Sequence, residues 1–416
     1  MYVHPFWSYR PIVGGFAVKN HLENAEFIAP EDFVPALQSV YDSGAALPEG
    51  MSRDLATRHR LVFDSADAAD THLSSLSAYQ AKALPVIDQI EMTNRCPYTC
   101  GMCPRTISMT RELGDMSMDV FTSLITQVAG RQRYLALHHF GESLLHKGLP
   151  DAVAFARDMR VRTALSCNPP SLRPQLAEQL MRSGIVSLLL SQDSLDPETY
   201  KSIRGRVARA SLADTHIREL VRLRNEGGYD TAITLQMINM DANRDEANRF
   251  IDYCAEVGVD RGVVIRLGRW DFDDSYIEQI GEVTAPGYTA PCSLPWTALV
   301  ALWDGRIVPC CHDYNGEVVL GDLRTQTLDE IWESATARHF RDRNDDSAFC
   351  RKCAFSKWFK EQQREREGFL YFHRERAGEG EERVEWVNPE SIGWRDGVAW
   401  FNRFDVLTGA SAGASS

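Results

Sequence analysis

The chain has 416 residues, of which 44% are hydrophobic and 25% are charged, and this composition is typical of a folded globular protein. Asp and Glu number 58 against 45 Lys and Arg, for a net charge of −13, so the chain lacks the net positive field that attracts nucleic acid or anionic lipid. It shows neither a secretory signal at its start nor eighteen consecutive apolar residues, and we expect a cytoplasmic protein with no nucleic-acid or membrane partner.

Residues 1–85 are expected to form a small N-terminal cap or recognition module. An opening that contains Pro and Gly precedes two helix-like stretches at 31–41 and 66–81. The segment 16–28 is similar to the short strand–turn beginnings of peptide-recognition modules, which bind a peptide by adding it to the edge of a sheet.

From residue 86, short apolar runs alternate with longer amphipathic segments, as in successive parallel strands joined by helices. Strands are predicted at 85–92, 133–139, 161–167, 186–191, 231–238 and 262–267, and helices at 117–130, 149–159, 172–183, 212–226 and 244–257. Six such units over 86–285 favour an incomplete α/β barrel, although an open doubly wound sheet has the same local pattern. In either fold, chemistry is expected at the C-terminal ends of the strands.

The first cysteine group, Cys96, Cys100 and Cys103, directly follows the first predicted strand. In a reducing cytosol, such clustering indicates metal or iron–sulfur ligation rather than disulfides. The spacing C-x3-C-x2-C suits a cubane cluster in which one iron has no protein ligand. A three-cysteine zinc site is the alternative, but the nearest histidines, His138 and His139, are on another predicted strand.

This cysteine loop resembles that of the radical S-adenosylmethionine (radical SAM) superfamily, and the resemblance covers about residues 85–268. It implies a partial (β/α)6 barrel and a [4Fe–4S] cluster whose open iron binds the amino and carboxylate groups of SAM. One electron, from a donor such as flavodoxin or ferredoxin, then cleaves SAM to methionine and a 5′-deoxyadenosyl radical that abstracts hydrogen from the substrate.

The same resemblance implies which residues contact SAM. Gly141, Glu142 and Ser143 are similar to the Gly-Gly-Glu-Pro motif that receives the SAM amino group, although Phe140 and Ser143 depart from it. Met102 stands where the family usually has an aromatic residue against adenine. Further expected contacts are Asn168, Ser191, Asp193 and Arg204, near the ribose or carboxylate, and Gln236, which has a plausible inward position on the fifth strand. For single polar residues at strand ends, a helix N-cap or a satisfied turn is the alternative interpretation.

A second group supplies four further candidate ligands: Cys292, Cys310, Cys350 and Cys353. Asp304-Gly305 predicts a hairpin that returns Cys310 toward Cys292, and Cys311 is a spare thiol beside it. A zinc ribbon fits the spacing equally well. Residues 286–360 are, however, similar to the twitch domain, a shortened SPASM domain, which implies one fully ligated auxiliary [4Fe–4S] cluster.

The C-terminal part is expected to be an extension at 361–407 followed by a disordered tail at 408–416. The extension combines a charged stretch with aromatic residues that we expect to pack on the body of the protein. The tail consists of Gly, Ala and Ser.

Three residues were assigned candidate catalytic roles. Cys167 ends the third strand and is a possible hydrogen-atom donor at the barrel mouth, although a free cysteine is more often core. His139 is a candidate proton acceptor if it, rather than His138, faces inward. Arg266, on the sixth strand, is placed inward only by alternation.

The functional hypothesis is a radical SAM oxidoreductase acting on a small polar natural-product intermediate. The resemblance is to aminocyclitol and aminoglycoside dehydrogenases, which oxidise a secondary alcohol to a ketone with the auxiliary cluster as electron acceptor. The alternatives are a maturase that modifies a precursor peptide bound by residues 1–85, an epimerase in which a cysteine returns hydrogen, and a zinc scaffold for protein interactions.

Overall fold

A computed structural model describes residues 85–132, 134–266, 294–344 and 347–353 and the strands at 369–374 and 381–387. Within the first 68 residues it describes 2–3, 7–12, 15–20, 25–43, 47, 50–65 and 68. Most of the predicted helix at 66–81, Cys292 and the predicted tail lie outside the described residues. In the described parts, no helix is long and apolar enough to cross a membrane.

Six neighbouring parallel strands form the centre of the molecule: β6 (Ile87–Ile90), β7 (Tyr134–Ala136), β8 (Arg162–Cys167), β9 (Ser187–Ser191), β10 (Ala232–Asn239) and β11 (Arg261–Arg266). The helices around them are α4 (Pro104–Ile107), α5 (Met118–Val128), α6 (Leu149–Asp158), α7 (Pro174–Ser183), α8 (Pro197–Arg204), α9 (Ala210–Glu226) and α10 (Ala247–Val257). Short 3-10 turns are η1 (Ser143–Leu145), η2 (Pro169–Ser171) and η3 (Asp241–Glu246).

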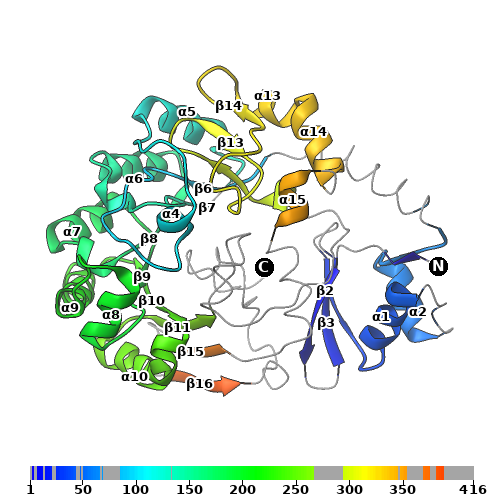
Figure 1. Ribbon diagram of the computed structural model, residues 1–416, viewed down its shortest axis with the longest axis horizontal. Coiled ribbons are helices and arrows are strands. Elements are labelled where there is room, and N and C mark those ends of the chain that lie inside the picture. The colour runs from blue at the N-terminus through cyan, green and yellow to red at the C-terminus, as the bar shows by residue number, and fades with distance from the viewer. Residues whose placement is uncertain are drawn as a thin grey trace.

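The order of these strands decides between the two predicted α/β folds. The strands follow one another across the sheet in chain order, and α5, α6, α7, α9 and α10 lie along its convex side (Figure 1). A doubly wound sheet would reverse its strand order and carry helices on both faces. The prediction of an incomplete barrel is therefore confirmed.

Residues along each strand alternate between two environments, as strand geometry requires. Leu165, Leu188 and Leu235 belong to the large core that the helices cover. Ala164 and Leu189, one position away, belong to a separate small cluster on the other side of the sheet. This alternation determines which side chains at the strand ends face the barrel interior.

The N-terminal module has its own core. Strands β2 (Trp7–Ile12), β3 (Gly15–Asn20) and β4 (Ala25–Ala29) form an antiparallel sheet, and β1 (Tyr2–Val3) pairs with β5 (Val62–Phe63). Helices α1 (Phe33–Ser43) and α2 (Met51–Arg58) complete the described module. Val18 and Ala29 of the sheet pack with Phe33 and Leu37 of α1 in a cluster distinct from the barrel core.

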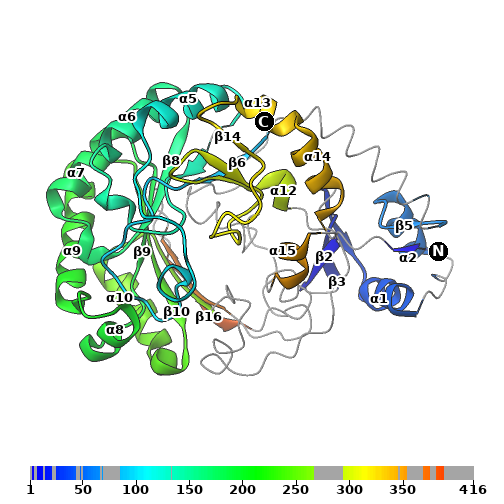
Figure 2. The same ribbon diagram turned by 45° about the horizontal axis from the view of Figure 1, so that its top comes forward.

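The predicted hairpin at Asp304-Gly305 is confirmed, but it is also part of the barrel sheet. Strands β12 (Leu299–Ala301) and β13 (Arg306–Val308) are antiparallel, and β12 pairs in parallel with β6. The remaining elements are β14 (Gly321–Asp322), α12 (Leu294–Thr297), α13 (Leu328–Glu333), α14 (Ala335–Asp342) and α15 (Ala348–Lys352). In both views, α15 lies close to the N-terminal strands β2 and β3 (Figure 2).

Two strands in the C-terminal extension were not predicted. β15 (Phe369–Arg374) pairs antiparallel with β11, and β16 (Glu381–Val387) pairs with β15. They cover the edge that β11 would otherwise expose, which protects an open sheet from pairing with other chains. The high charge of this segment concealed its strand character.

One buried ion pair holds the last crossover of the barrel. Asp260 Oδ2 accepts from Arg224 Nη1 at 2.7 Å and from the backbone N–H of Ile233 at 2.7 Å. Both charged side chains are buried, with 7% and 8% of their surface exposed. The pair therefore ties the end of α9 to the starts of β10 and β11.

We expect Asp260→Ala to lower the free energy of unfolding by about 3–5 kcal/mol, because it leaves the Arg224 guanidinium buried without its carboxylate. Urea denaturation followed by circular dichroism measures this loss. The control is Glu256→Ala, which removes the exposed pair between Arg218 on α9 and Glu256 on α10 and should cost less than about 1 kcal/mol. Equal losses of unfolding free energy in the two variants would contradict the structural role given to the buried Arg224–Asp260 pair.

Candidate functional site

The first cysteine group lies in the loop between β6 and α4, and the end of α8 holds this loop in place. The backbone N–H of Thr99 donates to the carbonyl of Arg204 at 3.3 Å, and that of Gly101 donates to the carbonyl of Ile203 at 3.3 Å. Cys103 directly precedes α4, which begins at a proline, a residue that suits the first helical position. The loop thus has contacts on both sides of Cys100.

The chemistry of the three thiols fits an iron–sulfur cluster. Burial raises the pKa of Cys96 to about 12, with a further contribution from the Glu142 carboxylate, and raises that of Cys103 to about 11. Burial also raises the pKa of Cys100. Such thiols become thiolates where a metal centre compensates their charge.

Three thiols in this loop would bind three different irons of a cubane. Among the described residues, no three His, Cys, Asp or Glu side chains surround one ion position. Three cysteines of a cubane bind three different irons, so they do not need to converge on one point, whereas ligands of zinc do.

Four side chains that the resemblance linked to SAM form one buried polar network beside this loop. Asn168 Nδ2 donates to Glu142 Oε2 at 2.8 Å, and Asn168 Oδ1 accepts from Arg204 Nη1 at 2.9 Å. Arg204 Nη2 pairs with Asp193 Oδ2. Arg204 Nη1 also lies 3.9 Å from the Sγ of Cys100. The network therefore joins the segment after β7, the ends of β8 and β9, and α8.

Glu142 is fully buried, and burial raises its pKa to about 7, against the hydrogen bonds from Asn168 and Leu144. Its neighbour Gly141 has φ +98°, and a Cβ there would lie 2.2 Å from the carbonyl oxygen of Thr93. A glycine is thus required at this position of the motif. The close approach sets Glu142 directly against the cysteine loop, where a carboxylate could receive an ammonium group.

Helix α8 is the part of the site that sequence patterning missed. The Asp196 side chain caps it by accepting from the N–H of Thr199 at 2.9 Å, and Pro197 is its first residue. Asp-Pro-Glu is a recognisable helix start, so the signal was present in the sequence. The helix also buries Tyr200 completely, in a cluster with Cys100 and Met102, and no sequence motif singles out Tyr200.

The other expected SAM contacts lie around this network. Met102 is buried in the cluster with Tyr200 and Cys100. Ser191 pairs in register with Gln236, and Gln236 alternates with buried Thr234 on the side of the sheet opposite Leu235. Ser143 is buried in η1, next to Glu142. Their contacts with SAM stay predictions.

Cys167 does not lie where the hydrogen-donor hypothesis requires it. It is buried in the core beneath the helices, and its register partner Leu190 belongs to the same core. Ser166, the preceding residue, alternates to the interior side. Of the two positions considered for Cys167, the β8 register therefore gives the core position, which is the commoner one for a free cysteine, rather than the barrel mouth.

The Nδ1 of His139 is hydrogen bonded to the Oε1 of Gln89 at 2.8 Å. This bond directs His139 toward the barrel interior. The Nδ1 of His138 instead accepts from the backbone N–H of Ser166 at 3.0 Å. This bond fits a structural role for His138. Arg266 ends β11, and its side chain lies outside the described residues.

The second cysteine group is described in part. Cys310 follows β13 and is buried, Cys350 is half-buried within α15, and Cys353 is buried at the end of that helix. Cys311 packs against Val300, Leu302 and Val308. Ligation by Cys310, Cys350 and Cys353 stays a prediction.

Comparison with known proteins gives two matching domains and several relatives. Residues 90–280 match the radical SAM superfamily, and residues 292–354 match the SPASM iron–sulfur cluster-binding domain. PqqA peptide cyclase of Streptomyces rochei is 28% identical over 174 residues, which are 41% of this chain and 45% of the relative. The chain thus spans less than half the length of that relative.

Two further likenesses differ in the parts that they cover. The S-adenosyl-L-methionine-dependent 2-deoxy-scyllo-inosamine dehydrogenase of Niallia circulans is 21% identical over 260 residues, 61% of this chain and 84% of the relative. Streptococcus suis SuiB, solved bound to precursor peptide SuiA, has a TM-score of 0.52 at 13% identity and covers 85% of this chain and 93% of its own. With the cysteine loop and the barrel, these matches identify a radical SAM domain at residues 90–280 and a SPASM iron–sulfur cluster-binding domain at residues 292–354.

Proposed function

We propose that the chain is a radical SAM oxidoreductase that modifies a peptide held by its N-terminal module. SAM and a [4Fe–4S] cluster at Cys96, Cys100 and Cys103 would supply hydrogen-atom abstraction. Glu142 would bind the SAM amino group, and Arg204 would bind its carboxylate while remaining paired with Asp193. The second cysteine group would supply the acceptor for the electron released when the substrate is oxidised.

The observation that carries the peptide proposal is a separate N-terminal module with a sheet open to pairing. Its antiparallel strands β2, β3 and β4 pack on α1 through a core of their own. The likeness to SuiB supports the same interpretation. It covers 85% of this chain, which is a larger share than residues 86–416 make up, so it extends into the N-terminal module. A cap that only shielded a small molecule would not need an independently packed sheet.

Strand β4 is the better edge for a peptide. Among the described strands, β2 and β4 each pair with β3 alone. β2 contains Pro11, which lacks an N–H and blunts an edge, whereas β4 has an uninterrupted set of backbone donors. Ile28 of β4 is 71% exposed on the face opposite the module's core, where it would contact alternate side chains of an added strand.

The second candidate is oxidation of a secondary alcohol in an aminocyclitol. It is favoured by the dehydrogenase of Niallia circulans, 84% of whose length this chain matches. That relative aligns with only 61% of this chain, so this candidate assigns no task to the N-terminal sheet. The two candidate functions share the site around Glu142 and differ in the substrate, which is a peptide in the first and an aminocyclitol in the second.

We expect Ile28→Asp to weaken binding of a precursor peptide encoded beside the gene by about tenfold, since burial of an isoleucine side chain contributes about 1.5–3 kcal/mol. Fluorescence anisotropy of the labelled peptide measures this. Leu212→Asp, on exposed α9 of the barrel, is the matched control and should leave binding unchanged. Unaltered affinity in Ile28→Asp, or turnover of 2-deoxy-scyllo-inosamine without peptide binding, would favour the second candidate.

Replacement of Cys100 by Ala should abolish formation of 5′-deoxyadenosine from SAM, because the loop then has too few thiolates to hold the cluster. Chromatographic measurement of 5′-deoxyadenosine, together with iron content, tests this in anaerobically reconstituted protein. Cys254→Ala, in the buried core of α10, should retain both. Persistent cleavage of SAM in the Cys100 variant would disprove the assignment of this loop.

Binding of SAM should depend on pH through Glu142. Because burial raises the pKa of this carboxyl to about 7, it is protonated at lower pH and loses the negative charge that accepts from the N–H groups of the SAM amine. The dissociation constant measured by equilibrium dialysis should therefore rise about tenfold for each pH unit below 7. Glu142→Gln should bind SAM weakly at every pH, and a persisting dependence in this variant would assign the titration to another group.

A further inference from the structure

A buried ion pair outside the SAM network joins the parts of the chain that carry the two cysteine groups. Glu91 lies immediately after β6, and Arg111 lies in the segment between α4 and α5. Their side chains are 0% and 4% exposed. Arg111 Nη1 and Nη2 donate to the two carboxylate oxygens of Glu91 at 2.8 and 2.6 Å, a bidentate geometry that fixes both groups.

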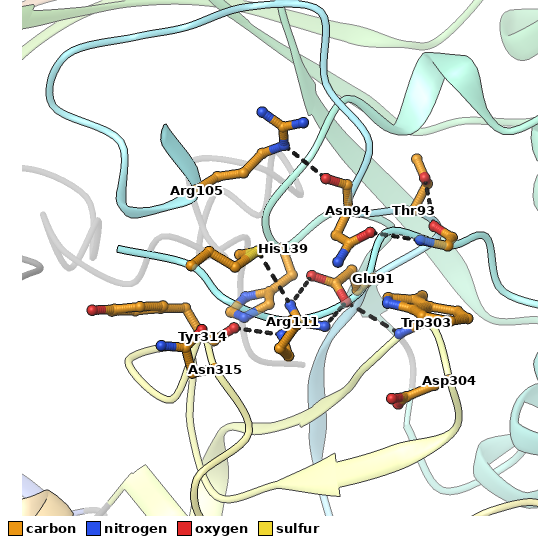
Figure 3. A network of polar contacts seen from close by, with 12 residues as sticks. Glu91, Thr93, Asn94, Arg105, Arg111, His139, Trp303, Asp304, Tyr314 and Asn315 are labelled. Atoms are coloured by element: carbon orange, nitrogen blue, oxygen red, sulfur yellow. Dashed lines mark hydrogen bonds and ion pairs between the residues drawn. The ribbon is translucent and has the colours of Figure 1, made fainter. Parts of the chain in front are cut away.

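The same pair binds the SPASM-type domain at two points (Figure 3). Arg111 Nε donates to the carbonyl of Tyr314 at 2.6 Å. The backbone N–H of Trp303 donates to Glu91 Oε2 at 3.2 Å. One carboxylate and one guanidinium thus connect β6, the segment after the first cysteine group, and the segments on both sides of Cys310.

Further contacts follow the same path. The Oδ1 of Asn315 accepts from the backbone N–H of Thr110 at 2.9 Å. The ring of Tyr314 meets that of Phe140 edge to face, with centroids 5.8 Å apart, and Phe140 precedes Gly141 and Glu142. The Cys310 segment is therefore held against both the cysteine-loop side and the SAM-motif side of the barrel.

Stability alone does not account for a charged pair at this place. Burial raises the pKa of Glu91 although Arg111 counteracts it, which shows that desolvation of the carboxylate is costly. A well-packed apolar pair is often as stable as a buried ion pair. What the ion pair adds is directional bonding, which fixes one arrangement of three segments.

We propose that Glu91 and Arg111 are positioning residues that hold the Cys310 segment in fixed register with the Cys96–Cys103 loop. This deepens the proposed function, because the distance between an electron donor and its acceptor governs how efficiently substrate oxidation is completed. Without the pair, SAM would still be cleaved, but fewer cleavage events would end in oxidised product.

The test uses anaerobically reconstituted full-length protein with Arg111→Lys and with the double variant Glu91→Gln/Arg111→Met, which leaves neither charge buried alone. Hydrogen exchange measured by mass spectrometry should show roughly tenfold faster exchange at residues 310–318 in both variants. Exchange in β9 should not change. With the peptide substrate, the ratio of 5′-deoxyadenosine to modified product should rise several-fold.

The matched control is Asp329→Asn, because Arg131 and Asp329 also link the barrel to the C-terminal domain but form an exposed pair. It should change neither exchange nor the ratio. Equal acceleration in β9 and in 310–318 would show that the pair only stabilises the whole fold, and unchanged exchange at 310–318 would also overturn the proposal. If the peptide is not a substrate, the exchange measurement still decides whether the pair holds this segment.

Discussion

The buried guanidinium of Arg204 is the constraint on which the site depends. Burial opposes its charge, but Asp193 and Cys100 more than compensate, so the pKa of Arg204 lies above its ordinary value. A guanidinium removed from water needs acceptors in fixed directions, and here they come from β8, β9 and the cysteine loop. Arg204 is the last residue of α8. The contacts of its guanidinium therefore also fix the carbonyls of Arg204 and Ile203, which accept from the backbone N–H groups of Thr99 and Gly101.

A second constraint is the continuity of the sheet between the barrel and the SPASM-type domain. β12 pairs in parallel with β6, the strand that leads into the first cysteine loop. The backbone N–H of Glu91 donates to the carbonyl of Ala301 at 2.8 Å, and its carboxylate then receives Arg111. The segment that precedes Cys310 is thus attached directly to the barrel edge through β12.

The barrel and most of the site could be predicted because they depend on local pattern and on motif. Alternating apolar runs locate the six strands, and the spacing of Cys96, Cys100 and Cys103 indicates a cluster. The four residues of the polar network were named from resemblance, but their mutual contacts were not foreseen. The position of Cys167 stayed open between the core and the barrel mouth, because it depends on the register of β8, which a shift of one residue reverses.

Sequence by itself determined the chemistry that this chain has available: clustered thiols, a Gly-Glu motif after the second strand and a net negative charge. Each of these is a property of residue type and spacing. Tertiary structure decided which groups meet. The Glu142–Asn168–Arg204–Asp193 network, the Glu91–Arg111 pair and the pairing of β15 with β11 join residues far apart in the chain. Such contacts form only when the whole sheet is assembled. Their free energy depends on the burial of the groups and on the direction of their hydrogen bonds, which no local pattern encodes.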